Sequence, residues 1–167
     1  MDMQSASVLT VSRAAPGTSA ARQRDTVETQ LWLDEHEWLH ALLKSADNVS
    51  PTFRFPDLIS ACVTLVLGEP GGAERIFGYL GKELVLRDPR TPRRREYLWR
   101  EQFNLLRDLQ LSDANRHPNP MFQLDQLTTA CVALARRCED AAARVLQHAR
   151  LNMAKRTVRG PVPKPSG

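Results

Sequence analysis

The chain has 167 residues, of which 42% are hydrophobic, and its formal net charge is +4. This length is enough for one domain with a real core or for two small ones, and no apolar run approaches the roughly 18 residues of a membrane span. The N-terminus lacks the charged-then-apolar pattern of a secretion signal, so we expect a cytoplasmic protein with no membrane partner. The three cysteines form no Cys-x-x-Cys pair, which argues for reduced core residues and against a cysteine metal site.

The first part of the chain predicts a tail, a strand and a helix. Residues 1–25 are rich in Ser, Ala, Thr and Gly without periodicity, which predicts disorder. Residues 27–33 alternate, with the odd positions facing inward, and are expected to form a short, half-buried strand. Asp34 and Glu37 have the spacing of a capping box, so a helix is expected to begin at Asp34 and to run to about Ala46.

One stretch of the chain occurs twice, at residues 53–63 and 122–132. The two copies read Phe-Arg-Phe-Pro-Asp-Leu-Ile-Ser-Ala-Cys-Val and Phe-Gln-Leu-Asp-Gln-Leu-Thr-Thr-Ala-Cys-Val. The order of apolar, small and basic positions continues without a gap over about 25 residues, which predicts an internal duplication. Apolar residues at helical spacing, including Cys62 and Cys131, predict a helix with one wide buried stripe in each copy.

Between the two copies, the pattern predicts a helix, a linker and a second strand. The helix is expected at about 73–84, and the prolines of 88–95 exclude a helix there. The second strand is expected at 96–99, with Tyr97 and Trp99 facing inward. A leucine-rich helix and a longer turn should follow.

The second copy of the repeated helix is expected to continue with little interruption. No Pro or Gly lies between Pro120 and Gly160, so the helix should extend to about Lys155. The chain therefore divides into a disordered tail, a first repeat, a basic linker, a second repeat and a basic disordered tail, at residues 1–25, 26–86, 87–94, 95–154 and 155–167.

The positive charge is confined to two segments. Residues 150–167 contain five basic and no acidic side chains, and residues 87–100 contain six arginines and two acids. Residues 26–149, which include the second of these segments, have a net charge of −2. Such clusters are typical of a protein that binds a polyanion, and the alternative is a solvent-exposed linker with a solubilising tail.

The order strand, helix, turn, helix, with Leu33 closing the strand before an acidic helix start, resembles the ribbon-helix-helix family of DNA-binding proteins. The resemblance covers roughly 26–67 and 95–137. In that family two copies pair their strands into an antiparallel ribbon that enters the major groove, while the helices share a core. Both copies lie in one chain here, which is similar to accessory proteins of conjugative and T-DNA transfer systems. The implied fold is mainly α, with two ribbon-helix-helix-like repeats sharing a short two-stranded antiparallel ribbon.

The resemblance implies that outward side chains of the ribbon read bases. In the first copy these are Glu28, Gln30 and Trp32. In the second copy they are Glu96 and Leu98, or Arg95 and Tyr97 if the register shifts by one residue. Gln30 can make a bidentate contact with adenine and Arg95 with guanine. Glu28 and Leu98 fit poorly against a polyanion.

The resemblance also assigns phosphate contacts. Arg54 flanks the N-terminus of the repeated helix, where the family holds a backbone phosphate, and the second copy has Gln123 there. Arg90, Arg93 and Arg94 would add contacts that are independent of sequence. The predicted DNA-binding residues are Gln30, Trp32, Arg54, Arg90, Arg93, Arg94, Arg95 and Tyr97.

A competing motif is His36-Glu37-Trp38-Leu39-His40, which matches the His-Glu-x-x-His helix of zinc proteases. The longer form of the motif requires Gly at 43 and His at 46, where this chain has Leu43 and Ala46. The helical wheel places His36 and His40 at the margin of the apolar stripe, so we expect surface histidines.

The sequence therefore favours a non-catalytic DNA-binding protein that acts in transcriptional regulation, plasmid partition or conjugative transfer. Double-stranded DNA is the expected partner, with other transfer or partition proteins as further candidates, and no cofactor, metal or catalytic residue is expected. The alternatives are a helical protein-interaction adaptor on the same scaffold and a small zinc hydrolase.

Overall fold

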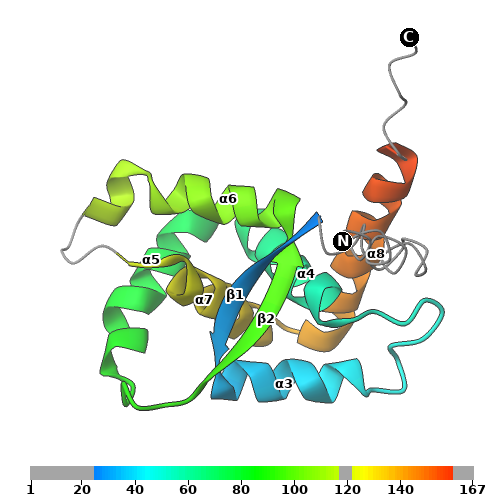
Figure 1. Ribbon diagram of the computed structural model, residues 1–167, viewed down its shortest axis with the longest axis horizontal. Helices are drawn as coiled ribbons and strands as arrows, with labels where there is room; N and C mark the ends of the chain where they lie inside the picture. The colour runs from blue at the N-terminus through cyan, green and yellow to red at the C-terminus, as the bar shows by residue number, and fades with distance from the viewer. Residues whose placement is uncertain (1–24, 117–121, 160–167) are drawn as a thin grey trace, which may run out of the picture.

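The computed structural model describes residues 25–116 and 122–159, and over these residues the chain is mainly helical with one two-stranded antiparallel sheet (Figure 1). The mainly α class is therefore confirmed. The first half contains β1 (Thr26–Trp32), α3 (Leu33–Leu43), α4 (Phe55–Leu67), α5 (Gly72–Lys82) and the short 3-10 helix η1 (Leu84–Leu86). The second half contains β2 (Arg93–Trp99), α6 (Arg100–Gln110), the 3-10 helix η2 (Asp113–Arg116), α7 (Leu124–Arg136) and α8 (Ala141–Arg159).

The two strands form a ribbon in which the central pair is Thr29 and Glu96. Each strand passes directly into a helix, so α3 begins at Leu33 and its N-cap is Trp32, with no side-chain cap. The predicted capping box at Asp34 is therefore wrong. The reason is that the strand ends on extended backbone at the tryptophan, and the next residue already starts the helix.

The middle helices α4 and α7 form the centre of the core, and they pack against each other. Leu58, Cys62, Leu127 and Cys131, predicted to lie on the two buried stripes, are fully buried. Burial raises the pKa of both the Cys62 and the Cys131 thiols, the latter to about 12, so both side chains stay protonated and pack as small apolar groups. The buried hydrophobic residues of both halves belong to one cluster.

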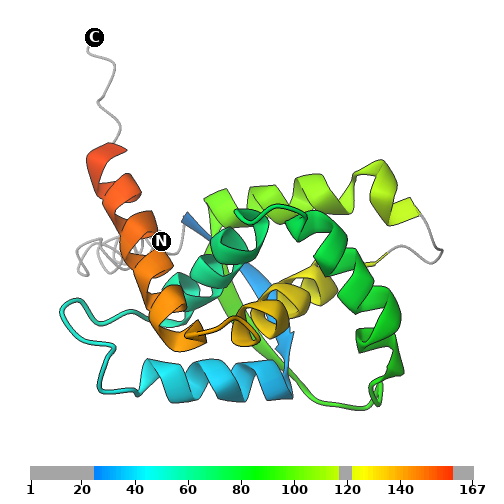
Figure 2. The ribbon, with the colours of Figure 1, turned by 180° about the vertical axis from the view of Figure 1, so that it is seen from behind.

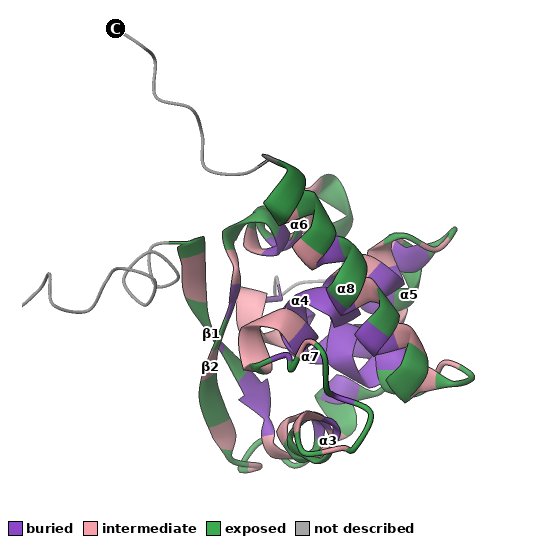
Figure 3. Ribbon diagram, turned by 90° about the vertical axis from the view of Figure 1, so that its right-hand side faces the viewer, coloured by how far each residue is buried: buried purple, intermediate pink, exposed green. Residues whose placement is uncertain are grey.

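The two halves are intertwined. β1 contacts α7 and β2 contacts α4, so each strand rests on the middle helix of the other half. The third helices cross over as well, because α5 packs on α7 and α8 packs on α4. In Figure 2, which shows the molecule from behind, the ribbon lies at the back, and Figure 3 shows α5 and α8 on the side of the middle helices away from the ribbon. Figure 3 shows the buried residues concentrated between these layers. The described halves therefore share one core.

A buried asparagine closes the turn before each middle helix. Asn48 donates through Nδ2 to the carbonyls of Leu43 (2.9 Å) and Phe53 (3.0 Å), and its Oδ1 accepts from the Phe53 N–H (2.7 Å). Asn115 makes the same three bonds, to the Gln110 carbonyl (2.9 Å) and to the carbonyl (3.1 Å) and N–H (3.0 Å) of Phe122. These bonds satisfy backbone groups that the turns would otherwise bury unpaired.

The second copy of the repeated helix is broken between α7 and α8, so the predicted continuous helix is wrong. Asp140 takes a left-handed conformation (φ 55°), and its carbonyl accepts the Arg144 N–H at 2.9 Å. In the first half Gly71 (φ 75°) does the same for Arg75 at 3.0 Å. Aspartate is among the few side chains that tolerate this conformation, so the break needs no glycine.

The segment boundaries also differ from the predicted ones. β2 begins at Arg93, so the last arginines of the predicted 87–94 linker belong to the strand. Helix α8 reaches Arg159 and includes the start of the predicted 155–167 tail. Most of the predicted 1–25 tail and the end of the second tail lie outside the described residues. None of the described helices is long and apolar enough to cross a membrane.

Candidate nucleic-acid interface

The outer face of the ribbon consists of Glu28, Gln30, Arg95 and Tyr97. Glu28 is opposite Tyr97 and Gln30 is opposite Arg95 in the β1–β2 register. Directly opposite residues of an antiparallel pair point to the same face, and successive residues alternate. All four side chains are exposed, so these residues are the ones that a ligand approaching the ribbon meets first.

This register decides between the two alternatives for the second strand, in favour of Arg95 and Tyr97 outward. Leu98 is fully buried, and Glu96 lies opposite the buried Thr29 on the helix side of the ribbon. The predictions that Glu96 and Leu98 face outward and that Tyr97 faces inward are therefore wrong. The buried Leu98 sets the parity of the strand, because every second residue shares its face.

Trp32 shares the strand face of Glu28 and Gln30, in agreement with the predicted outward set, but it is only 4% exposed. The guanidinium of Arg93 lies 3.7 Å from the centre of the Trp32 ring, and it also donates to the carbonyls of Pro89 and Thr91. At this end of the ribbon, Arg93 therefore covers the indole and holds the linker turn. Its predicted role as a free phosphate contact conflicts with these contacts.

The arginines beside the outer face are partly neutralised by acids. Arg95 Nε lies 3.3 Å from Glu28 Oε2, and Arg90 Nε lies 3.2 Å from Asp88 Oδ1. Hydrogen bonds from Arg90 hold the pKa of Asp88 below its usual value. Both pairs are largely exposed, with Arg95 at 68% and Arg90 at 89% side-chain exposure. Exposed ion pairs of this kind contribute little to the stability of the fold, so they can open when a more strongly charged anion binds the arginine.

The first turn of α4 carries both a free cation and a satisfied carboxylate. Arg54, at the N-cap, is exposed. Asp57 accepts hydrogen bonds from the Trp99 indole Nε1 (2.8 Å) and from Arg156 Nη2 (3.2 Å). Trp99 was predicted to face inward, and it is half-buried under Arg156, whose guanidinium lies 4.0 Å from the ring centre. Asp57 thus places a negative charge in the first turn of α4, where the helix dipole favours it, and Arg54 and Arg156 lie beside it.

Arg156 is a residue that sequence reasoning missed, because it was assigned to a disordered tail. Half-burial lowers its pKa, and the nearby Asp57 opposes that shift. The available signal was its spacing. Arg156 lies 69 residues after Arg87, the same offset that relates α4 to α7. Arg87 likewise has its guanidinium near an indole, 5.6 Å from the Trp32 ring centre.

Arg87 anchors the start of the basic linker. Its guanidinium donates to both carboxylate oxygens of the buried Glu35, at 2.8 and 2.5 Å, and to the Tyr79 hydroxyl. The bond to Glu35 raises the pKa of Arg87, and burial raises the pKa of Tyr79. This bidentate pair fixes where the chain leaves the first half and enters the arginine segment.

The histidines of the zinc-protease motif are used in packing. His36 Nε2 lies 2.7 Å from Glu96 Oε2, and its ring stacks on Phe55 with centroids 4.7 Å apart. His40 is exposed and stacks more distantly on the same ring, at 6.3 Å. The expectation of two surface histidines is therefore wrong for His36, which is 17% exposed. No group of three potential metal ligands occurs among the described residues.

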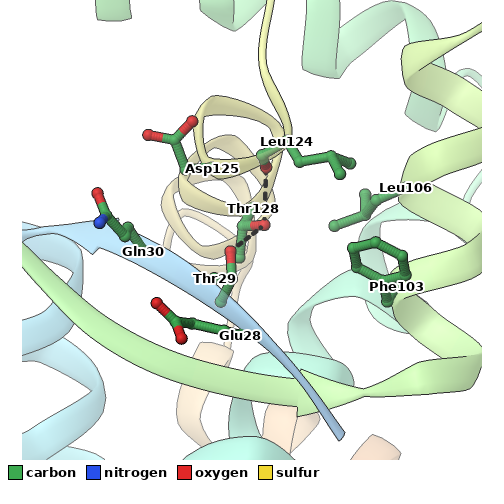
Figure 4. Close-up of a pocket in the computed structure, with 8 residues that line it drawn as sticks. All are labelled: Glu28, Thr29, Gln30, Phe103, Leu106, Leu124, Asp125 and Thr128. Atoms are coloured by element: carbon green, nitrogen blue, oxygen red, sulfur yellow. Dashed lines mark hydrogen bonds between the residues drawn. The ribbon is translucent and has the colours of Figure 1, made fainter.

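A pocket of about 210 Å³ lies between β1, α6 and the start of α7 (Figure 4). Its polar wall contains the hydroxyls of Thr29 and Thr128, which are hydrogen-bonded to each other at 3.0 Å. Its other lining residues are the acids Glu28 and Asp125, the amide Gln30, and the apolar Phe103, Leu106 and Leu124. Glu28 and Gln30 belong to both the pocket and the outer face of the ribbon.

The first half has a filled site in the corresponding position. β2 begins 67 residues after β1, and α7 begins 69 residues after α4. These offsets match Phe103 with His36, Thr29 with Glu96 and Leu124 with Phe55. At the filled site, the three counterparts are joined by the His36–Glu96 contact and the His36–Phe55 stack. Thr29 and Leu124 are smaller than Glu96 and Phe55, and the pocket lies at their position.

Comparisons of the chain with protein-family models, curated proteins and solved structures found no match. Function is therefore argued from the geometry of the ribbon and its surroundings.

Proposed function

We propose that this protein binds double-stranded DNA through the outer face of the β1–β2 ribbon, as a single-chain ribbon-helix-helix pseudodimer. Its role would be in transcriptional regulation, plasmid partition or conjugative transfer, without catalysis. The observation that carries the proposal is the antiparallel pairing of Thr26–Trp32 with Arg93–Trp99, which gives a two-stranded ribbon with Gln30 and Arg95 side by side on its exposed face. A ribbon of this kind fits the major groove.

The crossing of the two halves supports the pseudodimer. Each half presents a strand, a first helix, a closing asparagine and a middle helix in the same order. Each strand is buried against the middle helix of the other half, as the two chains of a ribbon-helix-helix dimer would be. The shared order and the shared asparagine bonds also support an internal duplication.

The chemistry of the ribbon face supports base contacts beside phosphate contacts. Gln30 offers an amide for adenine and Arg95 a planar fork for guanine. Arg94 is an exposed cation within β2, opposite Leu31 and on the other face from Arg95, and Arg54 is an exposed cation at the N-cap of α4. The negative charge of Glu28 repels the DNA phosphates. Its pairing with Arg95 reduces this repulsion as long as Arg95 does not contact a base or a phosphate instead.

The test is fluorescence anisotropy of a labelled random-sequence duplex at several salt concentrations. The Arg94→Ala/Arg95→Ala variant should bind less tightly and should lower the slope of log affinity against log salt by about 0.9 for each lost phosphate contact. Arg136→Ala is the matched control, because Arg136 is exposed at the C-terminal end of α7, whose N-terminal end meets the ribbon. It should leave the slope unchanged.

A second measurement separates base readout from phosphate binding. Gln30→Ala should weaken binding to a sequence selected by the parent protein by roughly 1–3 kcal/mol and should leave random DNA almost unaffected. The proposal would be overturned if the parent bound no duplex at low salt, or if the arginine variant and the control bound equally. The first of these results would favour the adaptor, with the ribbon face as a protein-binding surface.

A further inference from the structure

We propose that the pocket between β1, α6 and α7 binds a small aromatic cation, an aryl ring that carries an ammonium or amidinium group. The pocket lies between β1 of the first half and α6 and α7 of the second half, and it shares Glu28 and Gln30 with the outer face of the ribbon. The proposal does not rest on the proposed DNA binding. The pocket volume of about 210 Å³ is below the roughly 300–1,000 Å³ of pockets for drug-sized ligands, so the ligand should be the size of one ring with a short substituent.

The filled site of the first half indicates the aromatic part of the ligand. There the Phe55 ring lies against His36, with an interplanar angle of 12°. In the second half Phe103 takes the position of His36, but Leu124 takes the position of Phe55 and supplies no ring. Figure 4 shows Phe103 at the pocket beside Leu106. A planar ligand can therefore stack on Phe103 as Phe55 stacks on His36.

The charge of the lining indicates the cationic part. The described lining residues include the carboxylates of Glu28 and Asp125 and no lysine or arginine. Glu28 also lies 3.3 Å from Arg95 outside the lining, and an exposed pair of this kind can open for another cation. Asp125 lies in the first turn of α7, where the helix dipole favours a negative charge. The counterpart positions at the filled site, between β2, α3 and α4, hold Arg95 and Pro56. The two acids are thus found at the open site and not at the filled one.

The hydroxyl wall indicates that the ligand is not needed to satisfy buried polar groups. Thr128 donates to the Leu124 carbonyl at 2.9 Å and accepts from Thr29 at 3.0 Å. The binding free energy must therefore come from stacking and apolar contact in the pocket and from the two carboxylates at its polar side. Both parts of the ligand are then required.

The test uses three probes on the full-length protein, followed by ¹⁵N–¹H correlation spectra. Benzylammonium has both the ring and the charge, benzyl alcohol has the ring alone, and butylammonium has the charge alone. We expect saturable shifts at Thr29, Phe103, Leu124 and Thr128 with benzylammonium, and at least about fivefold weaker binding of either comparator, the upper range for one exposed ion pair. Equal binding of all three probes, or shifts confined to other residues, would overturn the proposal.

Two variants locate the site. Asp125→Asn should weaken benzylammonium binding about fivefold, and Asp108→Asn, an exposed change on α6 outside the lining, should not. Leu124→Phe introduces the ring present in the first half and should abolish binding by filling the space. If the Leu124→Phe spectrum lost its dispersion, the aspartate pair and the probe series would still decide. Unchanged affinity in Asp125→Asn would reject the site.

Discussion

At one end of the ribbon the backbone N–H of Trp99 donates to Ser60 Oγ at 2.9 Å, and at the other end the N–H of Trp32 donates to Thr129 Oγ1 at 3.3 Å. Each bond joins the last residue of a strand to the middle helix of the other half. Each indole also lies under an arginine. The backbone contacts that join the halves are therefore alike at the two ends, whereas the covering arginines come from different elements, β2 and α8.

The interiors behind the two ends differ. In the first half the buried Glu35 is paired with Arg87, whereas its counterpart Gln102 is buried with its side-chain oxygen unpaired. The space between α3 and β2 is filled by the His36–Glu96 contact, and the corresponding space between α6 and β1 is a pocket. The contacts that both halves share hold the fold together. The positions whose side chains are paired at one site and unpaired at its counterpart are free to take on a different function.

The largest expected loss of stability comes from breaking the Glu35–Arg87 ion pair, which the first half has and the second half lacks. Arg87→Ala should destabilise the protein by about 3 kcal/mol, because Glu35 is 2% exposed and would stay buried without its partner. Glu35→Gln/Arg87→Ala, which gives the first half the residue found at Gln102, should recover a large part of that loss. Urea unfolding measures both. A cost below about 1 kcal/mol for Arg87→Ala would show that the pair is not what holds the linker.

The next effect tests whether the two turns are equivalent. Asn48→Ala and Asn115→Ala should each cost about 2 kcal/mol, because each removes three hydrogen bonds, one from a backbone N–H and two to carbonyls. Chemical denaturation with matched m-values measures the two losses. A large loss at one asparagine and almost none at the other would mean that the halves do not share this device.

The smallest effect concerns the filled site. His36→Phe, which introduces the counterpart residue, should cost about 1 kcal/mol, because Glu96 loses its partner while 18% exposed. Adding Glu96→Thr should restore most of the stability, so the two changes should couple by about 1 kcal/mol. Thermal unfolding of the two single variants and the double variant gives that coupling. Additive losses would show that the His36–Glu96 contact is not an energetic pair.

Part of this arrangement could be read from local patterns. The apolar stripes of the middle helices, including Cys62 and Cys131, were predicted correctly, because helical periodicity is a property of neighbouring residues. The strand that became β1 was placed within one residue for the same reason. No local pattern singles out the closing asparagines, although Asn48 and Asn115 precede the two middle helices in the same order.

What the sequence alone determined is the mainly helical class, the two apolar middle helices and the basic segment beside the second strand. The tertiary structure decided the ribbon register, the burial of Trp32 and the pocket beside Phe103. The physical reason is that side chains on a strand alternate, so a shift of one residue exchanges its two faces. That choice depends on contacts such as Trp32 to Thr129, between residues 97 positions apart, which no local pattern encodes.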